Sequence, residues 1–176
     1  MQQLIARRWA IGLLSAVGAL SLGLVRSLGA ATLAPPAGKT ILTVDGLIEN
    51  TTDGTSALFD LEALEALGLV TLETATPWTE GVVRFEGVLG RTLLEAVGAK
   101  GTTLSAIALN DYVAPIPVSD FRDFDVILAL AANGQHLSVR DKGPVFIVYP
   151  FDAKPELRNE SIYARCVWQL ARLTVE

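Results

Sequence analysis

Residues 71–74 read Thr71-Leu72-Glu73-Thr74, and they end a strand-like run, 70–74, that leads into the loop Ala75-Thr76-Pro77-Trp78. Thr74 is the informative residue, because soft metal ions prefer thiolate ligands and this position carries a hydroxyl. A threonine hydroxyl titrates far above neutral pH, so it does not replace a thiolate as a ligand. This end of the run therefore offers no metal anchor.

Short strand-like and helical runs lie on both sides of this segment. Helices are expected at 60–67, which Asp60 can cap and Gly68 can end, and at 91–97 before Gly98. Asn133-Gly134 predicts a tight turn, and Arg158-Asn159-Glu160 predicts a solvated turn. Strands are expected in the β-rich runs that turn residues bound, namely 41–44, 70–74, 82–85, 104–109, 112–116, 126–131, 145–149 and 169–175. Short strands with few short helices predict a single α+β domain with mixed β-sheets.

The first 31 residues have the order of a secretory signal peptide. Arg7 and Arg8 precede an uncharged run, 9–25, and small residues follow at 29–31. The run of 17 residues is short for a membrane span, which needs about 20. We therefore expect cleavage and a periplasmic or otherwise exported protein, with an uncleaved membrane anchor as the alternative.

Residues 32–40 are expected to be a linker, because Pro35-Pro36 joins neither a helix nor a central strand. The folded domain is then 41–176. Without the three arginines of residues 1–31, 11 basic and 19 acidic side chains remain, a net charge of −8. No basic cluster survives, so a nucleic acid partner is excluded.

The chain has one cysteine and one histidine. Cys166 lies in an apolar run and has no partner for an internal disulfide, so we expect a buried, inert thiol. His136 follows the Asn133-Gly134 turn, where a solvated loop residue is expected. Too few ligands remain for a metal cluster, and nothing predicts a Ser-His-Asp arrangement.

Several further segments are each common in proteins, but their occurrence together in this order is hard to obtain by chance. They are Ala108-Leu109-Asn110-Asp111-Tyr112, Ile116-Pro117, Lys142-Gly143-Pro144, Tyr149-Pro150-Phe151-Asp152 and Arg165-Cys166-Val167-Trp168-Gln169-Leu170. Together with residues 71–74, this order resembles the sulfite-oxidase-like (oxidoreductase molybdopterin-binding) domain family. The resemblance implies that fold for nearly all of residues 41–176.

The resemblance also implies what this chain lacks. In that family a Thr-Leu-Gln-Cys-like segment supplies the thiolate that ligates molybdenum, and Thr74 stands where that cysteine is expected. The following Gly-Asn-Arg is replaced by residues 75–78. The chain is thus similar to short, exported pterin-binding regulators, in which a reduced pterin takes the place of the molybdenum cofactor, and no molybdenum is expected.

A pterin ring needs aromatic or apolar faces, an acceptor for its 2-amino group and N3–H, and a donor for O4. The loops and motif segments of this chain offer such groups. We predict that the ligand-binding residues are Trp78, Asn110, Asp111, Tyr112, Asp152, Arg165 and Trp168.

Each of these residues also has a plain structural interpretation. Trp78 can fold over the core, residues 110–112 can be a simple turn, and Asp152 can cap a neighbouring segment. Arg165 can form a salt bridge with Asp152 or Glu160. Trp168 lies in a run expected to be an apolar strand, so core packing is favoured for it.

The leading hypothesis is an exported, non-catalytic protein that binds a reduced pterin. It passes the ligand state to a partner such as the periplasmic domain of a membrane signalling protein. Two alternatives stay open: a small molybdopterin-dependent oxidoreductase, and an interaction module with a vestigial pocket.

Overall fold

The computed structural model describes residues 32–176. The signal peptide expected at residues 1–31 lies outside this part of the chain. No helix within residues 32–176 is long and apolar enough to cross a membrane. The segment expected to be a linker, 32–40, contains no helix or strand but contacts the domain. Thr32 forms an isolated bridge with Thr51, and the Gly38 N–H donates to the Asp60 carboxylate at 2.6 Å.

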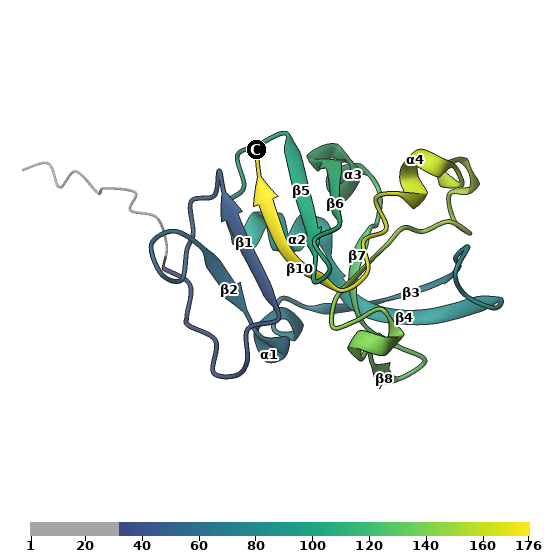
Figure 1. Cartoon of the computed structure of the whole chain (residues 1–176), viewed down its shortest axis with the longest axis horizontal. Helices are drawn as coiled ribbons and strands as arrows, with labels where there is room; N and C mark the ends of the chain where they lie inside the picture. The colour runs from purple at the N-terminus through teal and green to yellow at the C-terminus, as the bar shows by residue number, and fades with distance from the viewer. Residues whose placement is uncertain (1–31) are drawn as a thin grey trace, which may run out of the picture.

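The first of two sheets has five strands in the order β2-β1-β10-β5-β6 (Figure 1). Their bounds are Leu42–Gly46 for β1, Ala57–Phe59 for β2, Thr103–Ala108 for β5, Val113–Pro117 for β6 and Leu170–Val175 for β10. β1 and β10 are parallel, and the other neighbours are antiparallel. The last strand of the chain is therefore the middle strand of this sheet.

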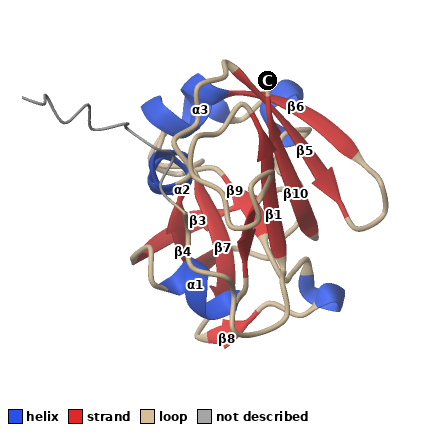
Figure 2. Ribbon diagram, turned by 90° about the vertical axis from the view of Figure 1, so that its left-hand side faces the viewer, coloured by secondary structure: helices blue, strands red, loops and turns tan. Residues whose placement is uncertain are grey.

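The second sheet has the order β3-β4-β7-β8, with β9 also paired to β7 (Figure 2). The bounds are Leu69–Ala75 for β3, Val82–Leu89 for β4, Ile127–Ala132 for β7, Gln135–His136 for β8 and Phe146–Val148 for β9. Asn133 and Gly134 join β7 to β8 with φ angles of 51° and 77°. The tight turn predicted there is confirmed.

Apolar side chains from both sheets form one core. Alternate residues of β5 are buried, whereas residues 127–131 of β7 are all buried, because both faces of that strand are covered. β4 and β7 approach so closely that position 87 has to be glycine. A Cβ at Gly87 would lie 2.1 Å from the carbonyl oxygen of Leu128.

The two predicted helices are present. In α1, Leu61–Glu65, the Asp60 side chain accepts a hydrogen bond from the Ala63 N–H at 2.8 Å, as expected of an N-cap. α2, Gly90–Ala96, packs against β4 and α3, Val118–Asp123 (Figure 2). α3 has no counterpart among the predicted helices.

A fourth helix corrects the prediction for residues 158–160. These residues are exposed, as predicted, but they lead into a helix: Asn159 caps α4, Glu160–Tyr163, by accepting a hydrogen bond from the Ile162 N–H at 3.1 Å. Single 3-10 turns lie at Val139–Asp141 and Pro155–Leu157. β10 begins at Leu170, so Trp168 lies in the loop before the strand and not in it.

Candidate ligand-binding site

A cavity of about 400 Å³ opens where three loops meet at one end of the sheets. The β3–β4 loop contributes Trp78, and the β5–β6 hairpin contributes Asn110 and Tyr112. Side chains in and after α4 form the remaining wall. Cavities of this size are typical of small-molecule sites.

Four of the ten described residues that line the cavity are aromatic: Trp78, Tyr112, Tyr163 and Trp168. The Trp78 ring meets the Tyr163 ring edge to face at a centroid distance of 6.0 Å and the Trp168 ring at 5.5 Å. Phe146 of β9 lies behind them, 6.4 Å from Trp78. Such perpendicular contacts hold each ring in place, so the cavity keeps flat apolar faces without a ligand.

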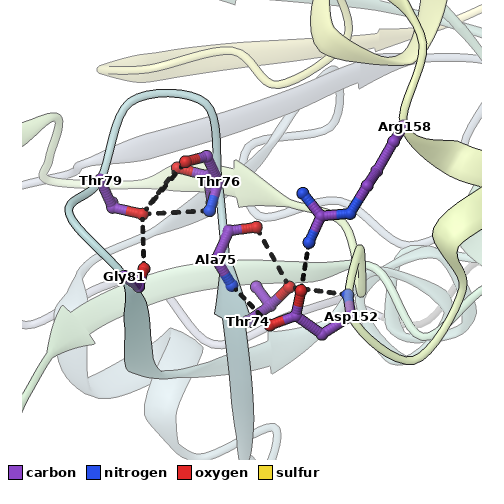
Figure 3. Close-up of polar contacts among 7 residues, drawn as sticks. All are labelled: Thr74, Ala75, Thr76, Thr79, Gly81, Asp152 and Arg158. Atoms are coloured by element: carbon purple, nitrogen blue, oxygen red, sulfur yellow. Dashed lines mark hydrogen bonds and ion pairs between the residues drawn. The ribbon is translucent and has the colours of Figure 1, made fainter.

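Two threonines fix the loop that carries Trp78 (Figure 3). The Thr76 N–H donates to Thr79 Oγ1 at 3.0 Å, and the two hydroxyls lie 3.1 Å apart. Thr76 Oγ1 also accepts from the Trp78 N–H at 3.2 Å. Hydrogen bonds within the loop itself therefore fix the backbone that carries Trp78.

Thr74 joins the end of β3 to the segment after β9 (Figure 3). Its side chain is fully buried, and its Oγ1 accepts from the Asp152 N–H at 3.1 Å. The Asp152 carboxylate in turn accepts from the Ala75 N–H at 2.9 Å and pairs with Arg158. Thr74 thus serves as an internal clamp and does not reach the cavity surface.

The β5–β6 hairpin is tied to the opposite wall. Tyr112 donates its hydroxyl hydrogen to the Ala164 carbonyl at 2.9 Å, and the Leu109 N–H donates to the Gln169 carbonyl at 2.9 Å. Asn110 Oδ1 accepts from the Tyr112 N–H, so its amide nitrogen stays available as a donor. These bonds hold the mouth of the cavity at a fixed width.

Polar groups also line the cavity. Glu160 contributes a carboxylate, and Gln169 contributes an amide whose nitrogen donates to the Val139 carbonyl at 2.8 Å. Cys166 lies against the cavity with its Sγ 3.5 Å from the Ile162 carbonyl. Burial raises the pKa of the Cys166 thiol to about 12, so it stays protonated at neutral pH.

Arg165 does not line the cavity but turns away into the protein. Its Nη1 donates to Asp120 Oδ2 of α3 at 2.7 Å, and the Tyr149 hydroxyl donates to the same oxygen at 2.8 Å. Burial, and next the charge of Asp120, raise the pKa of Tyr149, so the phenol stays protonated and keeps donating. Arg165 therefore forms a salt bridge, but with Asp120, so the predicted partners Asp152 and Glu160 are wrong.

The seven predicted site residues fall into two sets. Trp78, Asn110, Tyr112 and Trp168 line the cavity, whereas Asp111, Asp152 and Arg165 do not. Core packing for Trp168 is wrong, because its ring lies in a loop and keeps 39% of its surface exposed. Asp111 has a φ of 63°, so its conformation belongs to the hairpin turn.

Sequence reasoning missed six lining residues: Ala108, Glu160, Tyr163, Ala164, Cys166 and Gln169. The usable signal was Asn159, a strong helix cap, which starts a turn that brings residues 160 and 163 to one face. Gln169 carried no such signal, because its place depends on a φ of 51° in the loop before β10.

Metal ligands are not gathered in this part of the chain. Within residues 32–176 no three His, Cys, Asp or Glu side chains lie close enough to hold a metal ion. His136 is exposed, as predicted, but it lies in β8 and not in a loop, and its Nε2 lies 3.9 Å from Glu65 Oε1.

The family model of the oxidoreductase molybdopterin binding domain matches residues 38–152, well over half of the chain. The chain belongs to this family. No curated protein matches it. Among solved structures, the molybdopterin-binding domain is similar to the sulfane dehydrogenase SoxCD from Paracoccus pantotrophus, with a TM-score of 0.57 and 23% identity.

That match covers 76% of this chain and 37% of the SoxCD chain, so the domain spans little more than a third of that protein. At this identity the likeness shows the fold alone. It confirms the predicted sulfite-oxidase-like α+β domain with mixed sheets.

The family's name refers to molybdopterin, and the cavity fits the pterin part of that cofactor but not the molybdenum ion. Its aromatic walls suit a pterin ring. A molybdenum ion prefers a thiolate, and the one cysteine, Cys166, is a buried neutral thiol bonded to a carbonyl. The donor set therefore does not fit the metal.

Proposed function

We propose that this domain is a non-catalytic binding protein for a reduced pterin that carries no molybdenum. The observation that carries the proposal is the aromatic cavity bounded by Trp78, Tyr163 and Trp168, whose nearby sulfur is a protonated thiol. A flat heterocycle stacks in such a cavity without a covalent or metal anchor.

The place of Thr74 supports the absence of molybdenum. The resemblance puts this residue at the position of the metal-ligating cysteine, and its hydroxyl is fully buried in the clamp to Asp152. An atom without exposed surface does not ligate an ion in a neighbouring cavity. The oxidoreductase alternative has no comparable observation in its favour.

The polar lining supports a ring with hydrogen-bonding edges. Asn110 offers an amide donor suited to a ring carbonyl, and Gln169 offers an acceptor. Tyr112 holds the mouth of the cavity at a fixed width through its bond to Ala164. A site that combines aromatic walls with directed polar groups is typical of specific small-molecule binding.

The proposal includes export and relay to a partner, such as the periplasmic domain of a membrane signalling protein. Export rests on the residue order of positions 1–31, and the relay rests on the resemblance. N-terminal sequencing of the periplasmic fraction tests the first part. An intact N-terminus in the membrane pellet would favour the anchor instead.

Anaerobic calorimetric titration with 6-methyltetrahydropterin tests the binding proposal. We expect one site, and we expect Trp78→Ala and Trp168→Ala each to weaken binding at least several-fold, since a stacked aromatic contributes on the order of 1 kcal/mol beyond its buried area. Val82→Ala is the matched control, because Val82 is exposed on β4 and does not line the cavity. A wild-type protein without measurable binding would refute the proposal.

A further inference from the structure

Among the described residues that line the cavity, Glu160 is the one carboxylate, and no lysine, arginine or histidine accompanies it. We infer that Glu160 accepts hydrogen bonds from the 2-amino group and N3–H of the ligand. The cavity then selects 2-amino-4-oxo rings over 2,4-dioxo rings. This inference rests on the proposed function and adds the group that determines its specificity.

The position of Glu160 is fixed by its helix. The Asn159 cap sets the start of α4, and Glu160 is its first residue. Tyr163 follows three positions later and lines the same cavity, so both side chains share one face of the turn. The carboxylate and an aromatic wall are therefore placed by one short element.

The carboxylate of Glu160 is also uncommitted. Within residues 32–176, Glu86 pairs with Arg84, Glu49 pairs with Lys100 and Asp152 pairs with Arg158. No ion pair or hydrogen bond in the described chain engages the Glu160 side chain. A donor group of the ligand therefore replaces only water at the Glu160 carboxylate and breaks no hydrogen bond or ion pair within the protein.

The chemistry of the two partners is complementary. A 2-amino-4-oxopyrimidine ring presents two adjacent N–H donors in one plane, and a carboxylate accepts two parallel hydrogen bonds in the same geometry. A 2,4-dioxo ring has a carbonyl at position 2, which would face the carboxylate with a second acceptor. The pterin thus gains a charge-assisted hydrogen bond to Glu160, whereas the 2-carbonyl of the dioxo analogue is repelled by the same carboxylate.

The experiment compares 6-methyltetrahydropterin with its 2-oxo analogue, 6-methyltetrahydrolumazine, on wild type, Glu160→Gln and Glu156→Gln. Wild type should prefer the pterin by at least tenfold. Glu160→Gln should weaken pterin binding about five- to tenfold and leave lumazine binding unchanged or tighter. Glu156→Gln is the matched control, because Glu156 is exposed nearby and does not line the cavity.

The outcomes separate the two proposals. Equal affinity of wild type for both ligands, or an equal loss for both ligands in Glu160→Gln, overturns the role of Glu160 while pterin binding stands. Wild type that binds neither ligand overturns both. Unchanged melting temperatures of the two variants show that the affinity change is not a folding defect.

Discussion

Replacing Arg165 separates a structural role from a role in ligand binding. The guanidinium donates to Asp120, a carboxylate whose side chain is 7% exposed, and the other partner of the same oxygen is the Tyr149 hydroxyl. Arg165→Met keeps much of the apolar stem and removes the charge. The variant leaves a buried carboxylate with one hydrogen bond and no counter-ion.

The magnitude follows from the burial of the pair. Removing one partner of a fully buried ion pair costs about 3–5 kcal/mol. The Arg165 side chain is 25% exposed, so water partly replaces it, and we expect about 2–3 kcal/mol. For a domain of this size, this loss lowers the melting temperature by roughly 4–12 °C.

Urea denaturation of four proteins measures this: wild type, Arg165→Met, Asp120→Asn and the double variant. The double variant should be more stable than Arg165→Met, because an asparagine amide has no charge to compensate. Tetrahydropterin affinity should change little in Arg165→Met at temperatures where the variant is folded. A large affinity loss with unchanged stability would refute this reasoning and restore Arg165 as a ligand contact.

Three further variants or probes test other parts of the structure. Cys166 should react with a thiol reagent at pH 8 only after unfolding, because burial raises its pKa to about 12; equal rates in native and unfolded protein would contradict this. Hydrogen bonds from the Ala63 and Gly38 N–H groups lower the pKa of Asp60, so its charge stabilises the fold above the unfolded pKa of about 4. The stability advantage of wild type over Asp60→Asn should therefore shrink as pH falls through the lower, folded-state pKa, and a constant difference would count against the cap. Thr74→Cys, expressed in a molybdopterin-competent host, should gain no molybdenum by elemental analysis, since position 74 is fully buried; one metal ion per chain would overturn the clamp interpretation.

Local signals were sufficient for most of the fold. The Asp60 cap, the Asn133-Gly134 turn and the apolar runs predicted elements that the structure contains. The sequence failed where an element is short and held by distant contacts. β2 has three residues and depends on pairing with β1, and α3 starts directly after the last residue of β6.

The candidate site was less predictable, because its geometry depends on contacts between distant residues. The partner of Arg165 is 45 residues away in α3, and no local pattern connects them. Trp168 has apolar neighbours on one side, yet its ring faces the cavity because the chain bends before β10. Trp78, predicted from its polar loop to bind the ligand, lines the cavity and also packs against the core, so both interpretations offered by the sequence describe part of its position.

The place of β10 between β1 and β5 has a consequence for how the protein is made. The first sheet lacks its middle strand until residues 170–175 have left the ribosome, so β1, which pairs with β2, and β5, which pairs with β6, each keep one edge open until then. The segment that closes the ligand cavity directly precedes that strand. Maturation of the sheet and completion of the binding site are therefore one late event, and a nascent chain that stalls before Leu170 presents two open strand edges to any chaperone nearby.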